Sequence, residues 1–215
     1  MVLLNELFKF VIYASTLYKI DESHSLKHSM SVYQYANSIF YQEVTQKPHL
    51  LEQKQIIDTC AILHDICDNK YVDETIGINN INKFLENKLE KDEISIINKI
   101  IQTMSYSKVI KYGYPKLGQY EDAYHIVRQA DLLAAYDIDR AIIYGMMVKK
   151  QEYNESLKES INLFNERVLK HMDDNLFYHK SALEIGKKLH KEVELKINDL
   201  YKISSFYICN NKDNY

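Results

Sequence analysis

Apolar side chains recur every three to four residues along most of this chain, which is the spacing of an amphipathic helix. Near the start Leu7, Val11 and Ala14 follow this spacing, while Pro48 and the Gly- and Pro-containing segment 112–118 interrupt it later. The pattern predicts helices over residues 1–20, 26–46, 50–66, 79–89, 93–106, 120–147 with a break near residue 129, 153–172 and 178–201. We therefore expect an all-α fold, a single-domain helical bundle.

Composition agrees with this expectation. Only 5 Gly and 2 Pro occur among 215 residues, which argues against a turn-rich all-β architecture. A chain of this length with 46% hydrophobic residues can bury one core of ordinary size. No change of composition marks a boundary, so we expect one domain over residues 1–204, with its core motifs in 21–140, followed by a polar tail over 205–215.

The net charge and the number of cysteines limit which partners and which cellular compartment we expect. A formal net charge of −3 argues against a chain built to neutralise phosphate backbones, so no stable nucleic-acid binding is expected. Glu6 and Lys9 interrupt the apolar start of the chain, which therefore fits neither a signal peptide nor a membrane span. Three cysteines cannot all pair within the chain, which favours a reducing compartment. We expect a cytoplasmic protein with no membrane partner, and a homodimer is left open.

Histidine and aspartate residues at the edges of the expected helices are the candidate chemistry. His24 and His28 bracket the start of the second helix, His64 and Asp65 end the third, and Asp131 lies in a later helix. Each has an ordinary structural alternative: a surface position for His24, a hydrogen-bonded core histidine for His64, and a helix cap for Asp131.

The combination favours a metal site. Adjacent helical residues differ by about 100° in direction, so His64 and Asp65 can reach one ion only at the flank of a helix. Asp131 shares a helix face with Ala134 and Ala135, where an unpaired buried carboxylate would be costly unless a metal ion keeps it charged. Imidazole with carboxylate oxygen suits a divalent ion such as Mn²⁺, Fe²⁺, Ni²⁺ or Zn²⁺.

The order His28, then His64 and Asp65, then Asp131 resembles the H…HD…D signature of the HD-domain metal-dependent phosphohydrolases. The flanking residues are similar to the small bacterial branch of that family, which includes nucleotide pyrophosphohydrolases. Its "D-x-S-H-D-x-x-H", "A-L-L-H-D-I-G-D-x-K", "I-x-x-I-S-x-S-K" and "V-x-D-A-D-R-L" motifs resemble residues 21–28, 61–70, 100–108 and 127–133. The resemblance covers about residues 21–200.

This resemblance implies an HD-type bundle in which His28, His64, Asp65 and Asp131 bind one divalent metal ion, with Mn²⁺ foremost and Fe²⁺, Ni²⁺, Mg²⁺ or Zn²⁺ as alternatives. It also implies a catalytic set of three residues, which are Asp68, Lys70 and His24. Asp68 would orient or deprotonate the attacking water, or alternatively cap the helix end with Lys70. His24 would donate to a phosphate oxygen or the leaving group, and Lys70 would neutralise phosphate charge.

The same resemblance implies contacts to the substrate from Lys108, Ser105, Ser107 and Arg128. Two departures from the family pattern bear on these contacts. Ser31 and Leu132 stand where the branch often has arginine, the side chain that grips phosphate in bidentate fashion. Phosphate binding is therefore expected to depend on the lysines and the single arginine named above.

The leading hypothesis is a metal-dependent phosphohydrolase that converts a nucleoside triphosphate to the monophosphate and pyrophosphate, with a small-molecule nucleotide as its partner. Alternatives within enzymes are a nucleoside 5′-monophosphate phosphatase and a hydrolase of a signalling nucleotide. An alternative of another class is a catalytically weak helical module that binds a metal or ligand.

Overall fold

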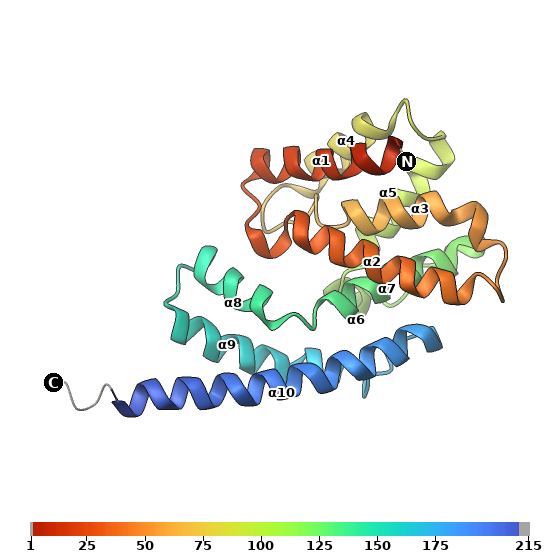
Figure 1. Ribbon diagram of the computed structural model, residues 1–215. Helices are drawn as coiled ribbons and strands as arrows, with labels where there is room; N and C mark the ends of the chain where they lie inside the picture. The colour runs from red at the N-terminus through yellow and green to blue at the C-terminus, as the bar shows by residue number, and fades with distance from the viewer. Residues whose placement is uncertain (1, 211–215) are drawn as a thin grey trace.

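The computed structural model describes the backbone of residues 2–210 and the side chains of residues 2–202. This part of the chain forms ten α-helices and three short 3-10 helices, with no strand among them (Figure 1). The α-helices are α1 (Val2–Tyr18), α2 (Leu26–Glu43), α3 (Leu50–Leu63), α4 (Glu74–Leu85), α5 (Lys91–Thr103), α6 (Tyr106–Tyr112), α7 (Glu121–Ala134), α8 (Ile138–Met147), α9 (Tyr153–Glu166) and α10 (Lys180–Asn210). The 3-10 helices are η1 (Glu22–His24), η2 (Gly118–Tyr120) and η3 (Val168–Lys170). The expectation of an all-α, single-domain fold is confirmed.

Buried apolar side chains form two clusters. The larger one joins helices α1 to α5 and α7 and includes Val11, Leu63 and Val127, all fully buried. The smaller one joins α8, α9 and α10 through residues such as Ile142 and Phe164. Helix α10 also packs on α7 and α2, so the long C-terminal helix ties the two clusters together (Figure 1).

Close contact between α8 and α9 depends on a glycine. A Cβ at Gly145 would lie 2.0 Å from Oγ of Ser156, so no larger residue fits without moving α9. The Ser156 hydroxyl itself donates to the carbonyl of Ile142 on α8, at 2.6 Å. The two helices therefore pack as one unit, and this unit forms one wall of the cavity described below.

The break in the segment 120–147 lies at residues 135–137 and not near residue 129, which corrects the sequence-based expectation. Gln129 is fully buried inside α7, where its side chain finds hydrogen-bond partners. The new helix begins after Asp137, whose carboxylate accepts from the backbone N–H of Asp139 at 3.2 Å. An N-cap of this kind satisfies a donor that the first helical turn leaves unpaired.

Other helix limits differ in ways that side-chain capping explains. Helix α4 begins at Glu74, five residues before its expected start, because the Asp73 carboxylate accepts from the backbone N–H groups of Thr75 and Ile76. Helix α6 is a short additional helix that the pattern did not predict. Helix α10 continues to Asn210 and so includes the first part of the expected tail, of which residues 211–215 lie outside the described residues.

No helix within the described part of the chain combines the length and the apolar character that crossing a bilayer requires.

Candidate metal centre and its cavity

The four expected metal ligands lie close together, with Asp131 next to the two histidines. His28 lies in the first turn of α2, His64 follows α3 as its C-cap with Asp65 next to it, and Asp131 lies in the last turn of α7. The two Nε2 atoms of the histidines are 3.0 Å apart. The Nε2 atom of His28 lies 3.2 Å from Oδ2 of Asp65 and 3.4 Å from Oδ1 of Asp131. We call these four residues the metal cluster; His28, His64 and Asp65 alone already form a group that could hold a metal ion.

A backbone contact sets the orientation of His64. Its Nδ1 lies 3.0 Å from the carbonyl oxygen of Ala61, which can only accept, so Nδ1 carries the proton. Nε2 is therefore the ring atom that faces the other three residues of the cluster. Histidine ligands of metal ions are commonly held in this way, with the far ring nitrogen donating to a carbonyl.

Charges within the metal cluster also fit a cation. Burial opposes the protonation of His64, but the Asp65 and Asp131 carboxylates outweigh it and raise the pKa of His64 to about 10. Burial likewise opposes ionisation of Asp65 and Asp131, but the two histidines outweigh it and hold both carboxyl pKa values well below their usual range. The cluster therefore attracts a positive charge to its centre, which a proton or a metal ion can supply.

One buried atom makes the fit to a metal ion more specific. Oδ2 of Asp65 is buried and has no hydrogen-bond partner of suitable geometry among residues 2–202. No Lys or Arg nitrogen of the described side chains lies within 4.0 Å of Asp65 or Asp131. A divalent ion would satisfy this lone pair, and two imidazoles with two carboxylates are a donor set that Mn²⁺, Fe²⁺ and Zn²⁺ accept.

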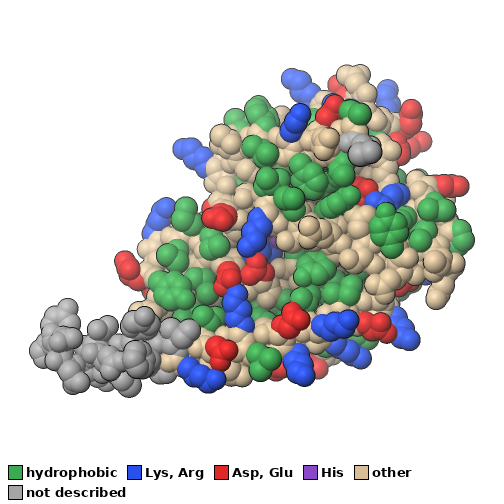
Figure 2. Space-filling model, viewed as in Figure 1, with side chains coloured by type: hydrophobic (Ala, Val, Ile, Leu, Met, Phe, Trp, Pro, Cys, Tyr) green, Lys and Arg blue, Asp and Glu red, His purple; other side chains and the backbone are tan. Residues whose placement is uncertain are grey.

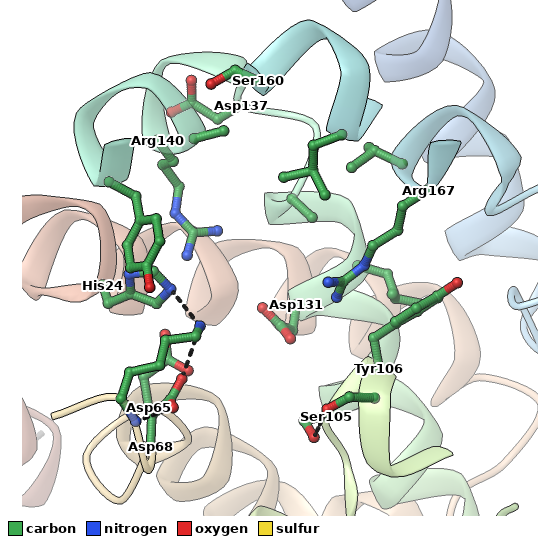
Figure 3. A pocket seen from close by; sticks show the side chains of 18 of the residues that line it. His24, Asp65, Asp68, Ser105, Tyr106, Asp131, Asp137, Arg140, Ser160 and Arg167 are labelled. Carbon is green, nitrogen blue, oxygen red and sulfur yellow. Dashed lines mark hydrogen bonds and ion pairs between the residues drawn. The ribbon is translucent and has the colours of Figure 1, made fainter. Parts of the chain in front are cut away.

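The cluster borders a cavity of about 660 Å³, within the size range of small-molecule sites. His64, Asp65 and Asp131 line it together with residues of the α3–α4 connection, α6, α8 and α9 (Figure 3). In the space-filling view, acidic and basic side chains lie next to one another across the middle of the molecule, between the upper helices and the layer of α9 and α10 (Figure 2).

Asp68, Lys70 and His24, the expected catalytic set, all line this cavity. Figure 3 shows His24 and Asp68 on the same side of it. The Lys70 ammonium lies 3.1 Å from Oδ2 of Asp68 and 3.3 Å from Nε2 of His24. Oδ1 of Asp68 also accepts from the backbone N–H of Lys70 at 2.9 Å, so the capping alternative for Asp68 has a contact of its own.

The proton on His24 can be placed from its partners. Burial lowers the pKa of His24 to about 4, which leaves the ring neutral at physiological pH. Because an ammonium only donates, Nε2 accepts from Lys70 and the proton lies on Nδ1, which contacts the hydroxyls of Ser23 at 2.5 Å and Tyr71 at 3.0 Å. In this arrangement His24 supports Lys70, and donation to a phosphate would require the proton to move to Nε2.

The expected substrate contacts divide into two groups. Ser105, Ser107 and Lys108 line the cavity, but both carboxylate oxygens of Glu74 accept from the Lys108 ammonium at 3.0 Å, which neutralises its charge. Arg128 does not line the cavity. It is 2% exposed, and its Nη2 donates to the carbonyl of Leu176 at 2.5 Å, so the structure places it in the core, away from the other site residues.

Two arginines that the sequence reasoning missed do line the cavity. Arg140 extends from α8, and Arg167 follows the last residue of α9 (Figure 3). Both lie outside the four motifs quoted for the family resemblance, so no motif marks them. Of the two positions where the family often has arginine, Leu132 lines the cavity and Ser31 does not.

Comparison with family models, with curated proteins and with solved structures finds no significant match to this chain. The likeness to the HD-domain enzymes therefore depends on the motifs in the sequence. The arrangement of two histidines and two aspartates beside a cavity does not depend on this likeness.

Proposed function

We propose that this protein is a metal-dependent phosphohydrolase of the HD-domain type that acts on nucleotides, converting a nucleoside triphosphate to the monophosphate and pyrophosphate. The observation that carries the proposal is the convergence of His28, His64, Asp65 and Asp131 beside a cavity of nucleotide size. These residues lie in α2, directly after α3 and in α7, and their order along the chain is the order of the family motif.

In this proposal the metal cluster holds one divalent ion, with Mn²⁺ as the first candidate. When bound, such an ion lowers the pKa of a water molecule and polarises a phosphoryl oxygen. The chain contributes rigid placement, because the Ala61 carbonyl holds the His64 ring so that its Nε2 faces the centre of the cluster. A ligand oriented in this way need not turn to bind the ion, which would take the place of the proton on Nε2.

Asp68 and Lys70 supply the proton handling and part of the charge. The Asp68 carboxylate takes a proton from the attacking water as the water oxygen bonds to phosphorus, and the bond from phosphorus to the leaving oxygen breaks. Lys70, 3.1 Å from Asp68, faces the charge that develops on the phosphate oxygens. His24 holds the Lys70 ammonium in place from the other side, at 3.3 Å.

The experiment that tests the proposal is a panel of nucleoside mono-, di- and triphosphates and signalling nucleotides, incubated with the purified chain and Mn²⁺. Phosphate and pyrophosphate are measured separately, and EDTA is the control. Pyrophosphate release from a triphosphate that EDTA abolishes is the expected result. Phosphate release from monophosphates alone would identify the protein as a monophosphate phosphatase instead. No turnover of any nucleotide by protein that holds its metal would favour the binding module.

A further inference from the structure

Five Lys and Arg side chains line the cavity, and the three lysines among them are already paired with carboxylates. The pairs are Lys70 with Asp68 at 3.1 Å, Lys108 with Glu74 at 3.0 Å, and Lys149 with Glu159 at 2.5 Å. Arg140 and Arg167 differ, because no carboxylate of the described side chains lies within 4.0 Å of either guanidinium. The two arginines are therefore the cations of this cavity that are available to an anionic ligand.

Local contacts hold each guanidinium in place. The Nε–H of Arg140 donates to the carbonyl of Ser23 at 2.6 Å, which leaves the terminal nitrogens directed into the cavity (Figure 3). The guanidinium of Arg167 lies over the ring of Tyr106, 4.0 Å from its centroid. Fixed guanidinium groups present two parallel N–H donors, the geometry that matches phosphate oxygens.

The two guanidinium groups approach the cavity from different helices, and Asp131 lies between them (Figure 3). This placement puts them beside the metal cluster and not in a separate pocket. A divalent ion would neutralise the two carboxylates of the metal cluster. The positive charges of Arg140 and Arg167 would then have no negative charge to balance them. A phosphate group beyond the one at the metal carries up to two negative charges and fits this balance.

We propose that Arg140 and Arg167 form the polyphosphate-binding part of the cavity, so that the substrate carries at least one phosphate beyond the phosphate at the metal cluster. Nucleoside di- and triphosphates belong to this class and monophosphates do not. The inference rests on the proposed function, because that function places the first phosphate at the metal cluster. The two arginines thereby bind phosphate in place of the arginine that the family often has at the position of Leu132, and in place of Lys108, which is paired with Glu74.

The test is isothermal titration calorimetry of the Mn²⁺-loaded chain with inorganic phosphate, pyrophosphate and tripolyphosphate. Arg140→Ala and Arg167→Ala are each compared with the wild type, and Lys170→Ala, an exposed charge in η3 that does not line the cavity, is the matched control. We expect each arginine variant to weaken tripolyphosphate binding about tenfold or more, the size of one lost charge-assisted contact. Inorganic phosphate binding should change less than about threefold, and the control variant should match the wild type.

Two further variants keep the result interpretable. Arg140→Lys and Arg167→Lys retain the charge but lose the paired donors, so they should recover part of the tripolyphosphate affinity, and they replace an alanine variant that does not fold. Unchanged tripolyphosphate binding in both arginine variants would overturn the inference. Equal losses for phosphate and tripolyphosphate would overturn it as well, because they would mean a single phosphate site.

The outcome separates this inference from the proposed function. Metal-dependent turnover with no effect of the arginines on polyphosphate binding would leave the function standing and remove the inference. Polyphosphate binding that depends on the arginines, with no turnover across the nucleotide panel, would retain the anion site and remove the function.

Discussion

Helix α7 contributes to two different histidine–aspartate clusters. Its last turn supplies Asp131 to the metal cluster. Its earlier turns supply Asp122, His125 and Gln129 to a second group, which His179, just before α10, completes and which we call the α7–α10 cluster. In that group the Oε1 of Gln129 accepts from the backbone N–H of His179, at 2.8 Å. The Gln129 amide nitrogen must then donate, to the carbonyl of His125 at 2.6 Å and to Nδ1 of His179 at 2.8 Å.

The proton on His179 follows from this contact. Because Nδ1 accepts from Gln129, the neutral ring carries its proton on Nε2, which lies 3.4 Å from Oδ1 of Asp122. The Lys47 ammonium lies 2.5 Å from the same carboxylate and supplies its positive charge. Burial opposes the ionisation of Asp122, but Lys47 and His179 outweigh it and lower the pKa of this carboxyl.

Both clusters contain histidine and aspartate, and they differ in whether a lysine is already paired with the carboxylate. The metal cluster directs acceptors toward one point, where no Lys or Arg of the described side chains reaches. The α7–α10 cluster already contains a donor or a cation for its carboxylate and joins the start of α10 to α7. Histidine and aspartate therefore form a group that could hold a metal ion in one place and join two helices in the other.

The largest expected effect appears when one aspartate of each cluster, Asp65 or Asp122, is replaced by alanine. Asp65→Ala should remove bound metal and all metal-dependent activity while the chain stays folded, because it deletes a ligand that has no replacement nearby. Asp122→Ala should keep the metal and lower the melting temperature, because it leaves Lys47 and His179 unpaired. Elemental analysis and thermal melting check both; full metal content in Asp65→Ala would end the assignment of the metal cluster.

A smaller effect is expected at Asp68, where a substitution should lower turnover without removing the metal. Asp68→Asn keeps the shape of the side chain and its contact with the backbone of Lys70 but removes the basic carboxylate. It should retain metal while kcat falls about 10²-fold, the typical size of a general-base contribution. Metal content and steady-state kinetics decide; a kcat close to that of the wild type would assign Asp68 to the loop-capping role.

The smallest effect concerns the pH dependence of the α7–α10 cluster. Burial lowers the pKa of His125 to about 4, while an unfolded histidine titrates near 6.5. Between these values the unfolded chain binds a proton that the folded chain does not, so the free energy of unfolding falls as the pH drops from 6.5 to 4. The wild type should lose melting temperature over this range.

The matched variant is His125→Phe, which keeps an aromatic ring against Tyr178, whose ring centroid lies 4.2 Å away, and removes the titration. Its melting temperature should fall by roughly 5 °C less than that of the wild type between pH 6.5 and 4. Scanning calorimetry at several pH values measures both curves. Parallel curves for the two proteins would show that His125 does not contribute to the acid sensitivity.

Much of the fold could be predicted because it depends on local patterns. The spacing of apolar residues places most helices, since each helix buries one face whatever it packs against. The errors fall where a side chain caps a helix, as at Asp73 and Asp137, or where a polar residue is paired inside one, as at Gln129. Such partners come from contacts that hydrophobic periodicity does not contain.

The sequence by itself indicated which four residues would form the metal cluster, through motifs that resemble those of the HD-domain enzymes. His64 and Asp65 follow the end of one helix, and His28 and Asp131 each lie in the terminal turn of another, so short motifs carry all four residues. The tertiary structure alone decided which cations face the cavity. It buries Arg128 against the carbonyl of Leu176 and brings in Arg140 and Arg167 from helices outside the motifs. The physical reason is that the placement of a side chain on its own helix is local information, whereas its charge partner depends on how helices distant in sequence pack together.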